Sequence, residues 1–291
     1  MKASSQGTYI QSINNVIDYI DKNIQKKLSL EHLAKIAGFS KYHFHRIFSA
    51  YMGETLNNFV MRLRAEKVAN ILCCYPHKSF TEIAFECGFA DSAAFTKAFK
   101  RRFNLAPNEW VKQKRSVEIQ LNKPAMPIFN NIHDIFISAS VENLPSYTIA
   151  YVRYIGKYAG DVELFTNLFN QLAEWCMLNK VPYQTSTSFC LYHDSIKLTD
   201  VNKLRVTVGV EVMPNVEVNN KIGKLVIESA RYLVASFKIN ENQYGYAWRY
   251  VFGYLLNDFN VKPASKPSFE MYKPCSLNNG EHYVSICVPL Q

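Results

Sequence analysis

A chain of 291 residues is long enough for two or three domains, and its 48% apolar and 20% charged residues exclude wholesale disorder. The formal net charge is +9, and residues 1–115 carry all of the excess, with 18 Lys and Arg against nine Asp and Glu. The remainder holds 15 of each sign, so the first part is expected to meet a polyanion; the alternative is a basic solvated surface.

The seven cysteines include no pair with the two-residue spacing of a zinc knuckle or a redox dithiol. We therefore expect reduced thiols and neither a metal nor a cofactor. No apolar stretch approaches the roughly 18 residues of a membrane span, and the first residues lack the apolar segment of a signal peptide. The sequence predicts a cytoplasmic protein without a membrane partner.

The basic part carries a helix-turn-helix pattern twice, at an offset of 50 and then 51 residues. In the first copy, "SLEHLAKIA" has helical spacing of its apolar residues and is followed by Gly38, which suits the left-handed end of a helix. Ser40 suits the N-cap of the next helix. The second copy repeats this arrangement with Gly88 and with Asp91 as the new N-cap. Two helices joined by a short turn containing Gly form the helix-turn-helix motif.

The second helix of each copy turns phenylalanines inward and a polar face outward. Such a face can enter the major groove of DNA, where Arg46 and Lys97 can donate to guanine and where Ala93 and Thr96 can contact thymine methyl groups. The candidate DNA-binding residues are Lys41, Tyr42, His45, Arg46, Ser92, Ala93, Thr96, Lys97, Lys100 and Arg101. Phosphate contacts are expected from Lys100, Arg101, Arg102, Lys112, Lys114 and Arg115. For each residue the alternative is a solubilising surface position.

Residues 54–75, "ETLNNFVMRLRAEKVANILCCY", have helical spacing of their apolar residues, so one long helix should join the two copies. Adjacent major-groove segments on one side of DNA lie roughly 34 Å apart. A rigid connector therefore predicts that two such segments are read without a dimer.

Residues 8–115 resemble the AraC/XylS family DNA-binding domain. The resemblance rests on "EIAFECGFADSAAFTKAFKRRFNLAPNEW", residues 82–110. It implies a fold of seven helices with two helix-turn-helix units, and double-stranded DNA as the partner. Lys97 stands where the family usually has Arg, and Asn104 where it usually has Gly; Asn tolerates the left-handed backbone.

Residues 116–132 contain "NKPAMPIFNN" and read as a linker. A strand, helix, strand, strand order then occurs twice with a period near 80 residues. "YTIAYVRY" corresponds to "YLVASFKI", "SFCLYHD" to "SFEMYKP", and "LRVTVGVEV" to "HYVSICVPL". The duplication predicts an α+β domain with an antiparallel sheet, a pseudo-twofold axis and a cleft along it. The whole chain is then multidomain, with an all-α double helix-turn-helix domain first.

Residues 133–291 resemble the GyrI-like effector-binding domain. Alternation along a strand places Glu270 and Tyr272 on one face, with Cys190 and Tyr192 in the equivalent places of the first copy. A carboxylate among aromatic residues is costly unless it meets a cation or hydrogen-bond donors. The resemblance assigns the position of Glu270 to a ligand that is often cationic and apolar.

The candidate ligand-binding residues are Glu270, Tyr272, Tyr192, Tyr151, Trp175 and Trp248. Their rings would supply apolar area and cation–π faces, and the alternative for each ring is a core position. The stripe formed by Tyr246, Tyr250 and Tyr254 is placed on the other side of its helix, where it could line the pocket or an interface.

The predicted function is a transcription regulator that binds double-stranded DNA and a small-molecule effector, and that is not an enzyme. The sequence shows no phosphate-binding glycine loop, nucleophilic triad or metal-spaced cluster, so no catalytic residue is assigned. Two alternatives stay open. The C-terminal domain could be a hydrolase or a drug-sequestering module, or it could contact a protein partner such as RNA polymerase.

Overall fold

The computed structural model describes residues 3–74, 78–113, 132–219, 221–274, 277–278 and 280–291. The chain divides into two compact units. The helical unit comprises the described residues up to Gln113 together with Lys197–Thr199, and the sheet unit comprises the other described residues. The predicted linker lies outside the described residues except for Ile132.

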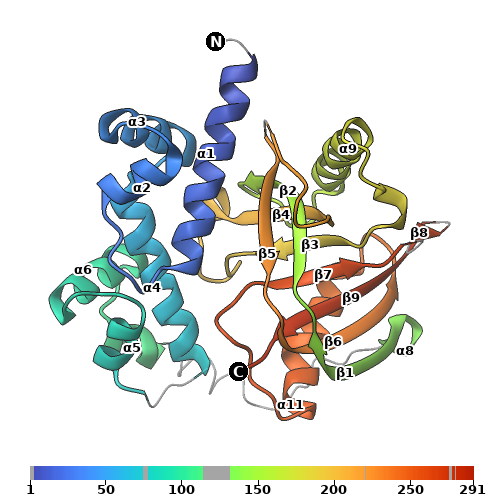
Figure 1. Cartoon of the computed structure of the whole chain (residues 1–291). Coiled ribbons are helices and arrows are strands. Elements are labelled where there is room, and N and C mark those ends of the chain that lie inside the picture. The colour runs from blue at the N-terminus through green and yellow to red at the C-terminus, as the bar shows by residue number, and fades with distance from the viewer. Residues whose placement is uncertain (1–2, 75–77, 114–131, 220, 275–276, 279) are drawn as a thin grey trace. The chain divides into compact units, whose positions relative to one another are not determined.

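The helical unit is built around one long helix. Its elements are α1 (Ala3–Lys22), α2 (Leu30–Ala37), α3 (Lys41–Met52), α4 (Leu56–Cys74), α5 (Phe80–Glu86) and α6 (Ser92–Phe103), with helical backbone again over residues 107–113. Figure 1 shows α4 between the α2–α3 pair and the α5–α6 pair. The prediction of a long connecting helix is confirmed.

Short-range side-chain contacts set the ends of the helices. Ser40 accepts a hydrogen bond from the His43 N–H at the start of α3, and Asp91 accepts one from the Ala94 N–H at 2.7 Å at the start of α6. Gly38 ends α2 in the left-handed region with φ of 73°. These caps satisfy backbone groups that a helix end leaves unpaired, as the sequence predicted.

Gly88 is required for two reasons at the turn between α5 and α6. Its φ of +91° is one that side chains rarely adopt, and a Cβ there would lie 2.7 Å from the carbonyl oxygen of Ile24. Asn104 ends α6 in the left-handed region with φ of 56°, which agrees with the tolerance expected of Asn.

The sheet unit holds, among the described residues, nine strands in one antiparallel sheet. The strands are β1 (Phe136–Leu144), β2 (Tyr147–Ile155), β3 (Ser188–Tyr192), β4 (Arg205–Glu211), β5 (Gly223–Ile227), β6 (Ala230–Ile239), β7 (Ser268–Tyr272), β8 (Leu277–Asn278) and β9 (Glu281–Pro289). Their order is β1-β6-β9-β7-β3-β4-β2-β5, with β8 paired to β9.

The order of the strands reflects the duplication predicted from the sequence. At the centre β3 pairs with β7, with Cys190 opposite Glu270. On one side of this pair follow β4, β2 and β5, and on the other side β9, β6 and β1. Each repeat has one strand more than predicted, β1 ahead of β2 and β5 ahead of β6. β1 pairs with β6 and β5 pairs with β2, so the two repeats exchange these additional strands.

The long helices of both repeats pack against the same face of the sheet. The helices are α9 (Val162–Leu178) and the continuous run α10 (Tyr244–Tyr250), a π turn (Val251–Leu255) and α11 (Leu256–Asp258), with the short α8 (Ile132–Ile135) ahead of β1. Leu172 of α9 packs with Val208, and Leu255 packs with Ile286. Tyr272 contacts both clusters, so it lies where the two repeats meet.

None of the helices in the described ranges is both long and apolar enough to cross a membrane.

Candidate functional sites

All ten residues predicted to contact DNA lie on α3 and α6, and all are exposed. Tyr42 is 80% exposed, an unusual position for a large aromatic residue. Lys41 forms an ion pair with Glu31, which raises the pKa of the lysine through a hydrogen bond and charge attraction. The Thr96 hydroxyl donates to the carbonyl oxygen of Ser92 at 2.8 Å, so this hydroxyl is hydrogen-bonded within α6.

A buried ionic network fixes α6 to α4. Glu66 accepts from Arg102 Nε at 2.6 Å and from Arg62 Nη1 at 3.2 Å. Arg62 also donates to Glu54 at 2.7 Å. The structure thus places Arg102, expected among the phosphate contacts, in a half-buried ion pair, because Glu66 on the neighbouring helix faces it.

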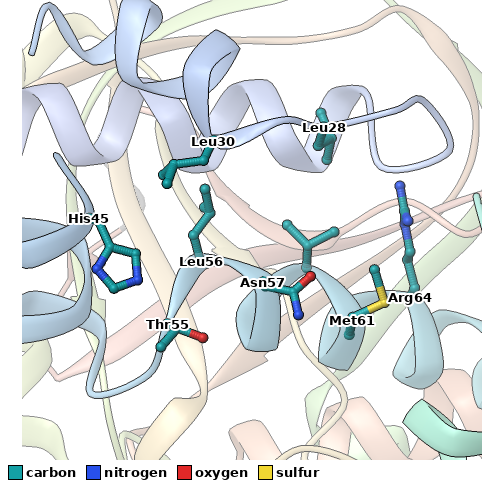
Figure 2. Close-up of a pocket in the computed structure, with 9 residues that line it drawn as sticks. Leu28, Leu30, His45, Thr55, Leu56, Asn57, Met61 and Arg64 are labelled. Carbon is teal, nitrogen blue, oxygen red and sulfur yellow. The ribbon is translucent and has the colours of Figure 1, made fainter. Parts of the chain in front are cut away.

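A hollow of about 350 Å³ lies beside the first helix-turn-helix (Figure 2). His45 of α3 lies at one end and Arg64 of α4 at the other, with Leu56 between them. Arg64 is buried and donates to the backbone carbonyl oxygens of Ile24 and Lys26 at 2.9 and 2.7 Å. This arrangement ties the segment after α1 to α4, so Arg64 has a structural role. Of the predicted DNA-binding residues, the hollow includes His45.

The centre of the sheet unit holds a buried carboxylate. Glu270 on β7 is 1% exposed. Its Oε2 accepts from the hydroxyls of Tyr192 at 2.8 Å and Tyr272 at 2.9 Å, and its Oε1 accepts from Trp248 Nε1 at 2.6 Å. Burial raises the pKa of Glu270, and the three hydrogen bonds oppose that rise. Burial, reinforced by the negative charge of Glu270, raises the pKa of Tyr192 and Tyr272 well above the ordinary value.

Aromatic rings surround the buried carboxylate. Trp248 meets Tyr192 edge-on at 5.3 Å between ring centroids and stacks with Phe252 at 5.9 Å. Tyr158 lies 5.6 Å from Tyr192, and its buried hydroxyl has no hydrogen-bond partner among the described residues. The arrangement combines one negative charge with ring faces, which suits a ligand that carries a positive charge on an apolar body.

Two of the predicted ligand-binding residues do not join this group. Tyr151 is fully buried on the opposite face of the sheet, in one cluster with Phe189. The pairing of β2, β4 and β3 places Tyr151 in the same cross-strand row as Phe189, whereas Cys190 shares the row of Glu270. Trp175 lies on the correct face but packs near the end of α9 in the core cluster, and no contact with Glu270 is found in the described part of the chain.

Three residues that surround Glu270 or are linked to it through tyrosine hydroxyls were not predicted from the sequence, namely Tyr158, Tyr244 and His282. Tyr244 has a signal in the sequence, because it lies one helical turn before Trp248, as Phe252 lies one turn after it. Tyr158 and His282 have none, since they reach the site from a loop and from the start of β9. In the described ranges no group of His, Cys, Asp and Glu side chains could hold a metal ion.

Comparisons with known proteins agree with this architecture. A family model described as the GyrI-like small molecule binding domain matches residues 139–291, and a helix-turn-helix domain model matches residues 33–113. The chain is a member of the GyrI-like family with an AraC-type helix-turn-helix domain. It is 31% identical to the probable transcription factor PqrA of Proteus vulgaris, over 33% of this chain and 79% of that protein.

Other similarities of this GyrI-like protein cover less of its relatives. It is 29% identical to the probable transcriptional regulator LumQ of Photobacterium leiognathi, over 35% of this chain and 41% of LumQ. The chain spans about two fifths or less of the first curated relatives that it matches. A cryo-EM structure of an EcmrR–DNA complex aligns over 94% of this chain and 98% of that chain, at 13% identity and a TM-score of 0.46, a likeness too low to carry an argument.

Proposed function

We propose that this GyrI-like protein is a transcription regulator that binds double-stranded DNA through α3 and α6 and senses a small apolar cation at Glu270. The isolated charge of Glu270 carries the proposal for the ligand. This carboxylate is buried, accepts three hydrogen bonds from neutral groups and forms no ion pair within the described residues.

A buried anion without a cation is costly, even when hydrogen bonds stabilise it. A ligand with a positive charge would remove that cost, and its apolar surface would contact Trp248, Tyr192 and Tyr272. Cation–π attraction adds about 0.5–2 kcal/mol for each well-placed ring. A neutral ligand of the same shape gains only the apolar contacts, so the site should select for charge.

The DNA-binding part of the proposal is supported by the exposed faces of α3 and α6. Both faces begin at a capped helix N-terminus, where recognition helices contact base edges. Arg46 and Lys97 are the side chains assigned to guanine, and the Thr96 methyl group is assigned to thymine. The excess positive charge of residues 1–115 supports nonspecific attraction to phosphate.

A ligand can regulate DNA binding only by its different affinity for two arrangements of the protein. We assign that role to the cation at Glu270, with RNA polymerase as a further partner at the promoter. The chain is proposed not to be an enzyme.

The ligand proposal is tested by calorimetric titration with an aromatic quaternary ammonium ion and its uncharged carbon isostere. We expect the cation to bind at least tenfold more tightly than the isostere, and Glu270→Gln to remove this difference. Glu163→Gln, an exposed position on α9, is the matched control and should leave the difference unchanged. Equal binding of the two compounds to the unaltered protein would contradict the proposal.

One observation favours the hydrolase alternative enough to test it. A carboxyl group whose pKa is raised by burial, and which contacts tyrosine hydroxyls, is suited to general acid–base catalysis. Turnover of a reactive electrophile that disappears in Glu270→Gln would support the enzyme. Stoichiometric binding of the same compound without turnover would support the sensor.

A further inference from the structure

A continuous chain of hydrogen-bonding groups connects Glu270 with the partly exposed imidazole of His282. The Tyr272 hydroxyl lies 2.9 Å from Glu270 Oε2 and 3.1 Å from the Tyr244 hydroxyl. The Tyr244 hydroxyl lies 2.6 Å from His282 Nδ1. The members come from β7, α10 and β9, so the tertiary fold brings them together.

Each hydroxyl in this chain has one proton and two neighbours that can accept it. Tyr272 can donate either to Glu270 or to Tyr244, and Tyr244 can donate either to Tyr272 or to His282. The chain therefore has two orientations. In the inward one, His282 Nδ1–H donates to Tyr244, Tyr244 to Tyr272, and Tyr272 to Glu270. In the outward one, Tyr272 donates to Tyr244, Tyr244 donates to His282, and Glu270 loses one donor.

We propose that Tyr244 and His282 are positioning residues that control whether Glu270 keeps its negative charge. This inference rests on the proposed role of Glu270 as the ligand-binding carboxylate. A protonated imidazole has a proton on both nitrogens and cannot accept, so it permits only the inward orientation. A neutral imidazole protonated on Nε2 accepts from Tyr244 at Nδ1 and selects the outward orientation, whereas the Nδ1–H tautomer still permits the inward one.

The sign of the effect follows from the number of donors at Glu270. Protonation of His282 gives the carboxylate all three donors, and hydrogen bonds to an ionised group favour its charged form. The protonated form of His282 therefore opposes the protonation of Glu270. A site linked in this way keeps its cation to lower pH than an isolated buried carboxylate would.

Other titratable groups lie around both ends of the chain. Those that interact with Glu270 are Cys190 and Tyr192 on β3, Tyr272 on β7, Tyr244 on α10 and Tyr158 from the loop before α9. Those near His282 or Tyr244 are Lys238, Glu241, Glu281 and Tyr283. Lys238 and Glu281 are exposed and pair with each other at 2.8 Å. Each variant described below changes only the residue named in it, so the other titratable groups stay constant in the comparison.

The test uses the ligand-free full chain and the indole N–H signal of Trp248 in nitrogen-15 NMR spectra. This N–H donates to Glu270, so its chemical shift should follow the protonation of the carboxylate across roughly pH 4 to 8. Glu270→Gln should abolish the titration and so assign it. Trp110 and Trp175 serve as internal references.

Two substitutions of equal size separate the orientations. His282→Glu places a carboxylate beside Tyr244, which can only accept while it is ionised, whereas His282→Gln can donate or accept. We expect the titration midpoint of the Glu variant to lie higher than that of the Gln variant by about one pH unit, the effect of one lost donor. In a Tyr244→Phe background the chain is broken, and the same comparison should give less than about a third of that difference.

If the midpoints of the Glu and Gln variants differ equally with Tyr244 and with Phe at position 244, the new charge acts through space. If the midpoints do not differ in either background, the hydrogen-bonded chain has no effect on Glu270. Each of these results would overturn the inference. His133→Phe, an exposed position on α8, should leave the midpoint unchanged. Cation binding by the unaltered protein is measured separately. Its absence would refute the proposed function but not the linkage between His282 and Glu270.

Discussion

Glu66→Gln tests the inference that an ionic network fixes α6 to α4. Glu66 is 6% exposed and contacts Arg62 and Arg102. Breaking a buried ion pair costs about 3–5 kcal/mol, because one charge is left without compensation. Gln keeps the shape and one acceptor, and Arg62 keeps Glu54, so the expected loss is about 2 kcal/mol of unfolding free energy.

The assay is urea unfolding followed by fluorescence in a Trp175→Phe, Trp248→Phe background, so that the signal comes from Trp110, whose ring contacts Phe99 in the core beside α6. Glu86→Gln is the matched control, because Glu86 faces Lys78 at 3.8 Å with both side chains about half exposed. Such surface pairs contribute about 0–1 kcal/mol. Equal destabilisation by the two substitutions would refute the structural role given to Glu66. If Glu66 also positions α6 on DNA, Glu66→Gln should weaken binding to operators that contain the base pairs contacted by α6. Binding to operators in which those base pairs are altered should not change.

Three further predictions follow from the same contacts. Arg46→Ala and Lys97→Ala should each weaken binding to a selected operator by about 1–3 kcal/mol and relax specificity at different base pairs. Lys100→Ala should lower the affinity for all DNA sequences alike and reduce the salt dependence of binding. Gel-shift titrations at several salt concentrations measure the affinity and its salt dependence. Gly88→Ala should cost about 3 kcal/mol or more, because a Cβ would lie 2.7 Å from the Ile24 oxygen; Gly53→Ala, at φ of +65° with open space around it, should cost about 1–2 kcal/mol. Burial raises the pKa of Glu270 above 4.5, so the folded state binds the proton of this carboxyl more tightly than the unfolded state does. The stability that protonated Glu270 contributes is therefore fully present below about pH 4.5. It is lost as the pH rises through the raised pKa of the folded state. Cation affinity should change in the opposite direction, and Glu270→Gln should flatten both profiles.

Local chemistry explains why the helical unit was predictable. Gly38, Ser40 and Asp91 act through contacts within four residues along the chain, so their roles can be read directly from the sequence. The pair between Glu66 and Arg102 could not be predicted in this way. It joins residues 36 positions apart, and the basic run that contains Arg102 reads equally well as a phosphate-binding surface.

The face of a strand can be predicted only where the strand alternates between apolar and polar residues. β7 places Glu270 between Phe269 and Met271, so its polar side chain marks one face. β2 is buried on both faces over its middle residues, and its own pattern leaves the orientation of Tyr151 undetermined. Tyr151 pairs across the strands with Gly209, which settles its face, and that pairing is long-range information.

The helix of the second repeat carries a predicted aromatic stripe whose direction only the tertiary structure settles. Tyr246, Tyr250 and Tyr254 are spaced at four residues, and Tyr250 and Tyr254 do stack at 5.2 Å. Tyr250 also packs against Phe136 in the core, so this stripe faces the sheet next to β1 and not Glu270. The π turn after Tyr250 gives the helix a wider turn at this point, and an ideal helical wheel cannot anticipate it. The residues that reach Glu270 lie before the turn, where Trp248 keeps the α-helical spacing from Tyr244. The chain from Glu270 to His282 therefore uses the regular part of this helix together with β7 and β9, and the approach of those two strands to Tyr244 is long-range information that the sequence does not mark.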